Sequence, residues 1–239
     1  MSGQRIAIHC SRKKPYFYMN IVKKLIIIIP FALFIGAAQA QAITIALPSS
    51  HAANEKSSEQ LIAQHSMSLG DRYAVPSVNT VFRDNILLTL AYLSGTVMNA
   101  KDINWNTIHK PTTYTMTLQP GEVFAFHDAI LPEFSGKKII TTNAHFDGSE
   151  GFVSDGYLYG DGVCHFASLI NWVARDAGLR VVAPTPHNFA KIPDIDPKYG
   201  TSIYAGDPRQ NLYVENTFNK PVKFVFTYKD DTMTVSVYK

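Results

Sequence analysis

Apolar residues recur with a helical period in two long segments of the chain. In residues 79–93 and 164–178, apolar side chains return every three or four positions, which is typical of helices that bury one face. Asn79 can cap the first helix, and a glycine follows the last apolar position of each. The sequence therefore predicts two amphipathic helices, the second of which begins at Cys164.

Shorter segments alternate apolar and polar residues with the period of two that β-strands show. Only short turns separate the last three of these segments, so we expect a C-terminal β-meander. Asn216 shares a face with Leu212 and Val214, so we expect it to be buried and hydrogen-bonded. The predicted fold class is α+β, a mixed or antiparallel sheet with the helix from Cys164 packed on it. The expected strands lie at residues 113–118, 122–126, 137–142, 179–184, 211–218, 221–228 and 232–239.

The segment before the first predicted helix is polar. Residues 41–74 are rich in Ala, Ser and Gln and contain few large apolar residues after Leu47. We expect a polar tether there, with one short helix near residues 55–64. The folded domain is then expected to cover residues 75–239.

The N-terminus has the pattern of an export signal. Lys23 and Lys24 precede an apolar run at residues 25–35, and Ala38–Gln39–Ala40 supplies the small residues of a cleavage site. The run is too short for a membrane-spanning helix, which needs roughly 18 to 20 apolar residues. We therefore expect an exported protein that is periplasmic, displayed on the cell surface or secreted.

This signal peptide covers residues 1–40 and leaves Gln41 as the mature N-terminus. Met19 can begin a conventional signal by itself, so residues 1–18 are interpreted as an upstream extension. After cleavage no stable membrane span is expected. The alternative is an uncleaved anchor, which the proline within the apolar run disfavours.

The charge of the chain is unevenly distributed. The full sequence has 22 Lys and Arg against 19 Asp and Glu, but residues 1–40 hold six of the basic residues and none of the acidic ones. The remaining chain has 16 basic and 19 acidic residues and is therefore acidic overall. Nucleic-acid binding requires a basic face on the folded part, so we do not expect a nucleic-acid partner.

Export would also determine which cysteines the mature protein contains. Cys10 lies in the segment that export removes, so Cys164 is the single mature cysteine and cannot form an internal disulfide. Gly160 and Gly162 allow a sharp turn into the helix, and a thiolate in the first helical turn faces the positive end of the helix dipole. That placement stabilises the thiolate by at most about 2 kcal/mol, so strong activation needs a partner as well.

Several segments, taken in order, resemble the VanW-like family. They are LQPGEVFAF at residues 118–126, GDGVC at residues 160–164 with a helix after it, and NLYVEN at residues 211–216. Asp161 interrupts the glycines that the family usually has, and His165 stands where the family has Gln. The resemblance implies an accessory protein of the cell envelope, associated with glycopeptide resistance, that acts on or binds peptidoglycan peptide or glycan.

His187 is the candidate partner of Cys164, since it follows a predicted strand that should return alongside the helix. A cysteine at a helix start with a histidine on a later strand is the order found in papain-like hydrolases and transglutaminases. Asn188, Asp194 or Asn216 could orient the imidazole. The function predicted on this basis is a Cys–His thiol hydrolase or transferase. The alternative is a non-catalytic binding or scaffold module in which Cys164 is a packed structural thiol.

Other residues could contribute to binding at the same site. Tyr159 could line a sugar- or peptide-binding groove beside Gly160, Gly162 and His165, although core packing is the usual role of such aromatics. Glu122 follows a Pro-Gly turn and could cap backbone N–H groups or act as an acid or base. The histidines have no metal-ligand spacing, since adjacent helical residues point about 100° apart, so we expect neither a metal nor a cofactor.

Overall fold

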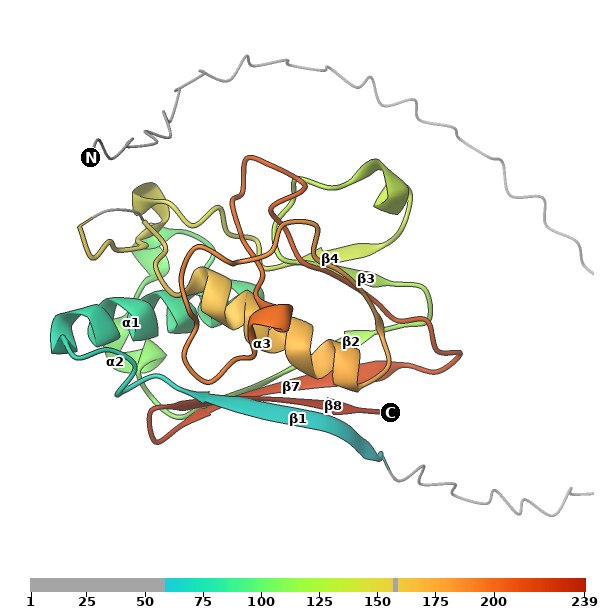
Figure 1. Ribbon diagram of the computed structural model, residues 1–239, viewed down its shortest axis with the longest axis horizontal. Coiled ribbons are helices and arrows are strands. Elements are labelled where there is room, and N and C mark those ends of the chain that lie inside the picture. Colours follow the sequence, from blue (N-terminus) through green and yellow to red (C-terminus); the bar gives the residue numbers. More distant parts are fainter. Residues whose placement is uncertain (1–58, 157–158) are drawn as a thin grey trace, which may run out of the picture. The chain divides into compact units, whose positions relative to one another are not determined.

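The fold contains two four-stranded sheets, and strands of both are labelled in Figure 1. The computed structural model describes residues 59–156 and 159–239. The predicted signal peptide and cleavage site lie outside the described residues. Because helices accompany one antiparallel and one mixed sheet, the predicted α+β class is confirmed.

The first sheet is antiparallel and carries the long strands. Its order is β1-β8-β7-β2. Alternate residues of β7 are buried, among them Phe224 and Phe226, while Lys223 and Thr227 on the other face are half-buried. The alternation of apolar and polar residues in the sequence therefore correctly indicates which face of β7 packs on the core. The strands are β1 Leu61–Ser68, β2 Thr112–Leu118, β7 Val222–Lys229 and β8 Thr232–Tyr238.

The second sheet consists of three-residue strands in the order β4-β3-β6-β5. Strands β3 and β4 are parallel, so their carboxyl ends meet at one edge, and the other pairs are antiparallel. Leu212, Tyr213 and Val214 are all buried, so β6 is covered on both faces. The strands are β3 Val123–Ala125, β4 Ile139–Thr141, β5 Arg180–Val182 and β6 Tyr213–Glu215.

Two long helices cover the core. The helix α3 spans Val163–Asp176 and packs against β1, β8, β5 and α1, which spans Pro76–Leu93. Phe166, Leu169, Ile170 and Val173 of α3 are fully buried, as their helical spacing predicts. The helix begins one residue before Cys164. Shorter helices are α2 Trp105–Ile108, η1 Ala100–Asp102, η2 Pro132–Phe134, η3 Gly148–Glu150 and η4 Pro197–Tyr199.

Two expectations about chain organisation are wrong. Leu61–Ser68, expected within a tether with a short helix, is the edge strand β1 and pairs with β8 along its length. The folded unit therefore starts ahead of residue 75. The last three strands do not form one meander either, because β6 belongs to the second sheet and only β7 and β8 are paired.

Asn216 directs the chain from one sheet to the other. Its amide nitrogen donates to Leu118 O at 2.8 Å and to Lys220 O at 2.9 Å, and its Oδ1 accepts from the N–H of Phe218 at 3.0 Å. The side chain is fully buried, so the expected burial and hydrogen bonding of Asn216 are confirmed, although Tyr213 and Glu215 on the other face of the strand are buried as well. These bonds bend the chain directly after β6, and β7 then begins in the other sheet.

Among the residues described, no helix is long and apolar enough to cross a membrane.

Candidate functional site

Loops from three parts of the chain meet at the N-terminal end of α3 (Figure 1). A Cβ atom on Gly160 would lie 3.1 Å from Phe146 O, so the loop after β4 touches the turn that enters the helix. Ile203 contacts Cys164 in the first helical turn, and the ring of His187 lies 6.0 Å from that of His165. This loop-bearing end therefore brings Cys164, His165 and His187 near one another.

Gly162 is the N-cap residue of α3 and has a φ of +99°. A Cβ atom at this position would lie only 2.7 Å from Phe82 O on α1. The missing side chain lets the start of α3 approach the backbone of α1. Gly162, expected in a binding site, has a packing role here.

The thiol of Cys164 lies against the backbone of Ile203. Ile203 N–H donates to Sγ at 3.3 Å, and Sγ lies 3.9 Å from Ile203 O. Cys164 is half-buried, and the surrounding protein desolvates its thiol group. Burial raises the pKa of the thiol to about 11, and the nearby Asp161 adds to the rise. Desolvation therefore outweighs the helix dipole.

His187 does not pair with this thiol. Its Nδ1–H donates to Ala190 O at 3.1 Å, and its backbone N–H donates to Gly200 O at 3.1 Å. Within the part of the chain that the structure describes, no hydrogen bond joins Cys164 to His187. Burial lowers the pKa of His187, so its ring is neutral at pH 7. The expected thiolate–imidazolium pair is therefore not formed in this arrangement.

His165 is buried against an arginine instead of facing a ligand. Arg72 Nη2 donates to His165 Nδ1 at 3.0 Å and to Pro193 O at 3.2 Å, while Nη1 donates to Ser68 O at 2.6 Å. Burial, followed by the charge of Arg72, lowers the pKa of His165 well below its ordinary value. The neutral His165 thus helps to fix Arg72, which connects β1 to the loop around Pro193.

Asn216 and Glu122 lie far from Cys164. Gly178, just beyond α3, approaches Phe218, which is hydrogen-bonded to Asn216. The axial rise between Cys164 and Asp176, near the end of α3, is about 18 Å, so Asn216 cannot orient an imidazole beside the thiol. Glu122 accepts from the N–H of Gln119 at 2.9 Å and pairs with Lys138 at 2.6 Å. The hydrogen bond from Lys138 is the main cause of its lowered pKa, and capping is its role.

The other candidates are at the loop end. Tyr159 is 64 % exposed, and its ring lies over Gly148, where a Cβ atom would come within 2.9 Å. Asn188 lines a pocket beside His187, and Asp194 lies 3.8 Å from Arg72. Neither is shown to orient His187, whose Nδ1 is bound to the backbone.

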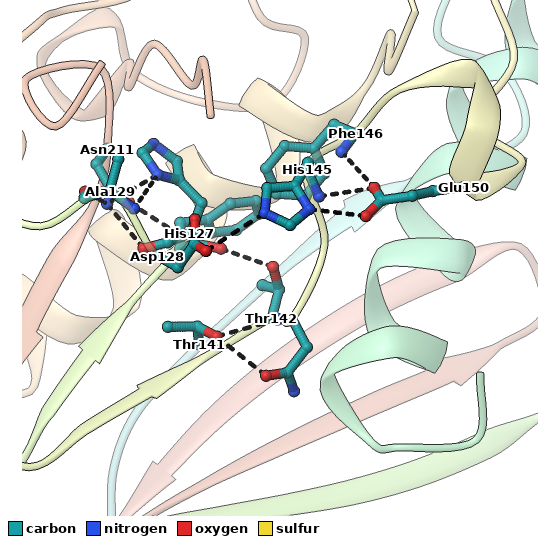
Figure 2. Close-up of polar contacts among 11 residues, drawn as sticks. His127, Asp128, Ala129, Thr141, Thr142, His145, Phe146, Glu150 and Asn211 are labelled. Atoms are coloured by element: carbon teal, nitrogen blue, oxygen red, sulfur yellow. Dashed lines mark hydrogen bonds and ion pairs between the residues drawn. The ribbon is translucent and has the colours of Figure 1, made fainter. Parts of the chain in front are cut away.

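Sequence reasoning missed a histidine–carboxylate cluster at the ends of β3 and β4, drawn in Figure 2. His145 Nδ1 donates to Glu150 Oε1 at 2.9 Å, and its Nε2 lies 3.3 Å from Asp128 Oδ2. The second oxygen of Glu150 accepts the N–H groups of His145 and Phe146 at 2.7 and 2.9 Å. The spacing of His145 and Glu150 was the available signal, but loop residues carry no periodicity that shows which side chains meet.

Buried polar groups hold this cluster in place. His127 Nε2–H donates to Gln210 O at 2.9 Å, and its Nδ1 accepts from the N–H of Ala129 at 3.2 Å. Asn211 donates to the carbonyl groups of His127 and Ala129 at 3.1 and 3.0 Å. Burial lowers the pKa of His127, which agrees with a neutral ring. The turn that carries Asp128 is therefore held by hydrogen bonds on both sides.

We expect His145 to titrate above its ordinary value, because Glu150 raises its pKa more than burial lowers it. The protonated form of His145 therefore stabilises the fold. This contribution is complete below the unfolded-state pKa of about 6.5 and is lost as the pH rises through the folded-state pKa. NMR titration of the imidazole checks this. Glu150→Gln should lower the pKa of His145, and Asp128→Asn should lower it less, because Glu150 is the larger contributor. An unchanged pKa in Glu150→Gln would contradict the assignment.

Within residues 59–156 and 159–239, no three His, Cys, Asp or Glu side chains are arranged to hold a metal ion. A family model described as VanW like protein matches residues 104–238, which is more than half of the chain. No curated protein and no solved structure matches the chain.

Proposed function

The chain belongs to the VanW-like family, and from this premise we propose that it is an exported envelope accessory protein that binds cell-wall peptide or glycan without using Cys164 as a nucleophile. Membership of the family associates the protein with the cell envelope and with glycopeptide resistance. The export signal expected for residues 1–40 supports an extracytoplasmic location.

The raised pKa of the Cys164 thiol, which the backbone of Ile203 contacts, carries the part of this proposal that excludes a cysteine nucleophile. The thiolate is the nucleophile in cysteine chemistry, and with a pKa of about 11 only about one thiol in ten thousand is ionised at pH 7. His187, the residue that would activate it, donates its Nδ1–H to the backbone at Ala190. A binding module needs neither group to be ionised.

Exposed aromatic side chains near the loop-bearing end support a binding role. Tyr159, Phe189 and Tyr204 are 64 %, 74 % and 50 % exposed. Each is close in sequence to a residue that meets the first turns of α3: Phe189 follows His187, Tyr204 follows Ile203, and Tyr159 precedes Gly160. Large exposed aromatic side chains are common where one partner must stack on a sugar ring or a peptide.

Co-sedimentation of the exported protein with purified peptidoglycan sacculi tests the proposal. We expect wild type and Cys164→Ser to sediment equally, and Phe189→Ala or Tyr204→Ala to bind about tenfold more weakly. Met98→Ala is the matched control, because Met98 is 78 % exposed and lies on the chain after α1.

Two results would overturn the proposal. The protein could fail to sediment with sacculi at all. Alternatively, wild type could release new amino groups or reducing ends from sacculi while Cys164→Ser releases none, which would establish the Cys164 enzyme.

A further inference from the structure

A pocket lies inside the loop that runs from His187 to Gly200. The two ends of this loop are joined, since His187 N–H donates to Gly200 O at 3.1 Å. A Cβ atom on Gly200 would lie 2.9 Å from His187 O, so only glycine lets the ends approach this closely. The loop thus closes on itself around a cavity of about 160 Å³.

The size of the cavity limits what it can hold. Sites for whole small molecules usually measure about 300 Å³ or more. The pocket therefore suits the end of a chain rather than a complete ligand or an internal stretch of a polymer.

The walls combine an apolar floor with charged side chains. Ile192 and Ile195 are 5 % and 4 % exposed and form part of the lining with Pro197. Lys191 and Asp196 also line the cavity. A small apolar group can therefore contact the floor while a charged group meets the rim.

The charges around the pocket favour an anion. Asp196 pairs with Lys198 at 3.3 Å, and Asp194 lies 3.8 Å from Arg72. Lys191 forms no ion pair with any residue that the structure describes. Arg72, which binds the loop through Pro193 O, is a buried cation whose Nε has no hydrogen-bond partner among these residues. Because Asp194 and Asp196 each lie against a basic residue, Lys191 leaves the net charge around the pocket positive.

We propose that this pocket binds the C-terminal carboxylate and the small terminal side chain of a peptide. Lys191 pairs with the carboxylate, and the floor of Ile192 and Ile195 contacts the side chain. Phe189, whose ring centroid is 4.0 Å from that of His187, covers the preceding residue. The inference rests on the proposed function and narrows it, because it assigns the pocket to the peptide part of the cell wall rather than the glycan.

Isothermal titration of the full exported protein with two probes tests the proposal. The probes are an N-acetylated tripeptide ending in alanine with a free carboxylate, and the same peptide as its C-terminal amide. We expect the acid to bind at least about tenfold more tightly than the amide, as for the loss of a charge-assisted pair. Lys191→Met should weaken binding of the acid about tenfold and leave binding of the amide unchanged.

Lys110→Met makes the same change of charge at an exposed position before β2 and should alter neither affinity. Equal binding of acid and amide, or equal effects of the two lysine variants, would overturn the carboxylate site. A purely structural role of Lys191 would weaken both probes together, which also overturns it.

Sacculus co-sedimentation separates this inference from the proposed function. If wild type binds sacculi but does not distinguish acid from amide, the pocket assignment is wrong and the binding function stands. If wild type binds the acid selectively but never sediments with sacculi, the pocket stands and the envelope function is wrong.

Discussion

Iodoacetamide will alkylate Cys164 in the folded protein on the order of a hundredfold more slowly at pH 8 than it alkylates an ordinary free thiol. The reason is the pKa of about 11, compared with about 8.5 for a free cysteine, since only the thiolate reacts. The rate should therefore rise about tenfold per pH unit between pH 7 and 10. Intact-mass analysis provides a direct readout, because the expected mature chain carries only this cysteine.

Two variants show which groups control the thiol. Asp161→Asn should raise the alkylation rate, because the charge of Asp161 helps to raise the pKa of Cys164. His187→Ala should leave the rate unchanged, because its Nδ1 binds Ala190 O and not the sulfur. A rate that is already maximal at neutral pH and falls in His187→Ala would instead restore the Cys164–His187 pair.

Gly162→Ala is expected to destabilise the fold by about 3 kcal/mol or more. The left-handed φ of +99° is unfavourable for alanine, and the new Cβ atom would lie 2.7 Å from Phe82 O. That oxygen belongs to the backbone of α1, which cannot move aside as a flexible side chain could. Denaturant unfolding measures the loss.

Gly95→Ala is the matched control for this glycine. Gly95 also has a left-handed φ, of +73°, but a Cβ atom there meets nothing within 4 Å. Gly95→Ala should lower the free energy of unfolding by about 1–2 kcal/mol, which is the cost of placing alanine in a left-handed backbone conformation. Equal losses in the two variants would show that the contact with α1 is unimportant and that Gly162 matters only for its φ.

The sequence predicted most elements because their patterns are local. The two long helices lie within a few residues of their predicted spans, since apolar spacing and the following glycines define them. Strand β1 was missed because its sequence, LIAQHSMS, is mostly small and polar, and only Met67 is fully buried. Its place at the sheet edge depends on pairing with β8, more than 150 residues away.

Membership of a sheet was less predictable than the existence of strands. Alternation cannot state which neighbour a strand pairs with, so β6 was placed beside β7. Strand β6 pairs with β3 and β5 on either side, its two faces pack in different apolar clusters, and Glu215 is held by Lys137 and Arg180. These partners come from distant parts of the sequence.

The candidate site was also predicted only in part. The sequence predicted that Cys164 and His187 lie near one another, and both are near the start of α3. The sequence analysis overestimated the activation of the thiol, because the effect of the helix dipole can be estimated from position, whereas desolvation depends on how the folded chain buries the thiol. The hydrogen bond between Arg72 and His165 could not be predicted, since the two residues are far apart in the chain.

The pairing of β1 with β8 also determines how the fold would respond to a mechanical load. Gln60 and Lys239 exchange backbone hydrogen bonds of 2.9 and 3.0 Å, so the chain enters the fold beside the end of β8. A force that lifts the chain preceding Gln60 off the sheet edge therefore opens the β1–β8 ladder one pair at a time, as a zipper opens. Because α3 packs against β1, peeling this strand away would uncover the helix that carries Cys164.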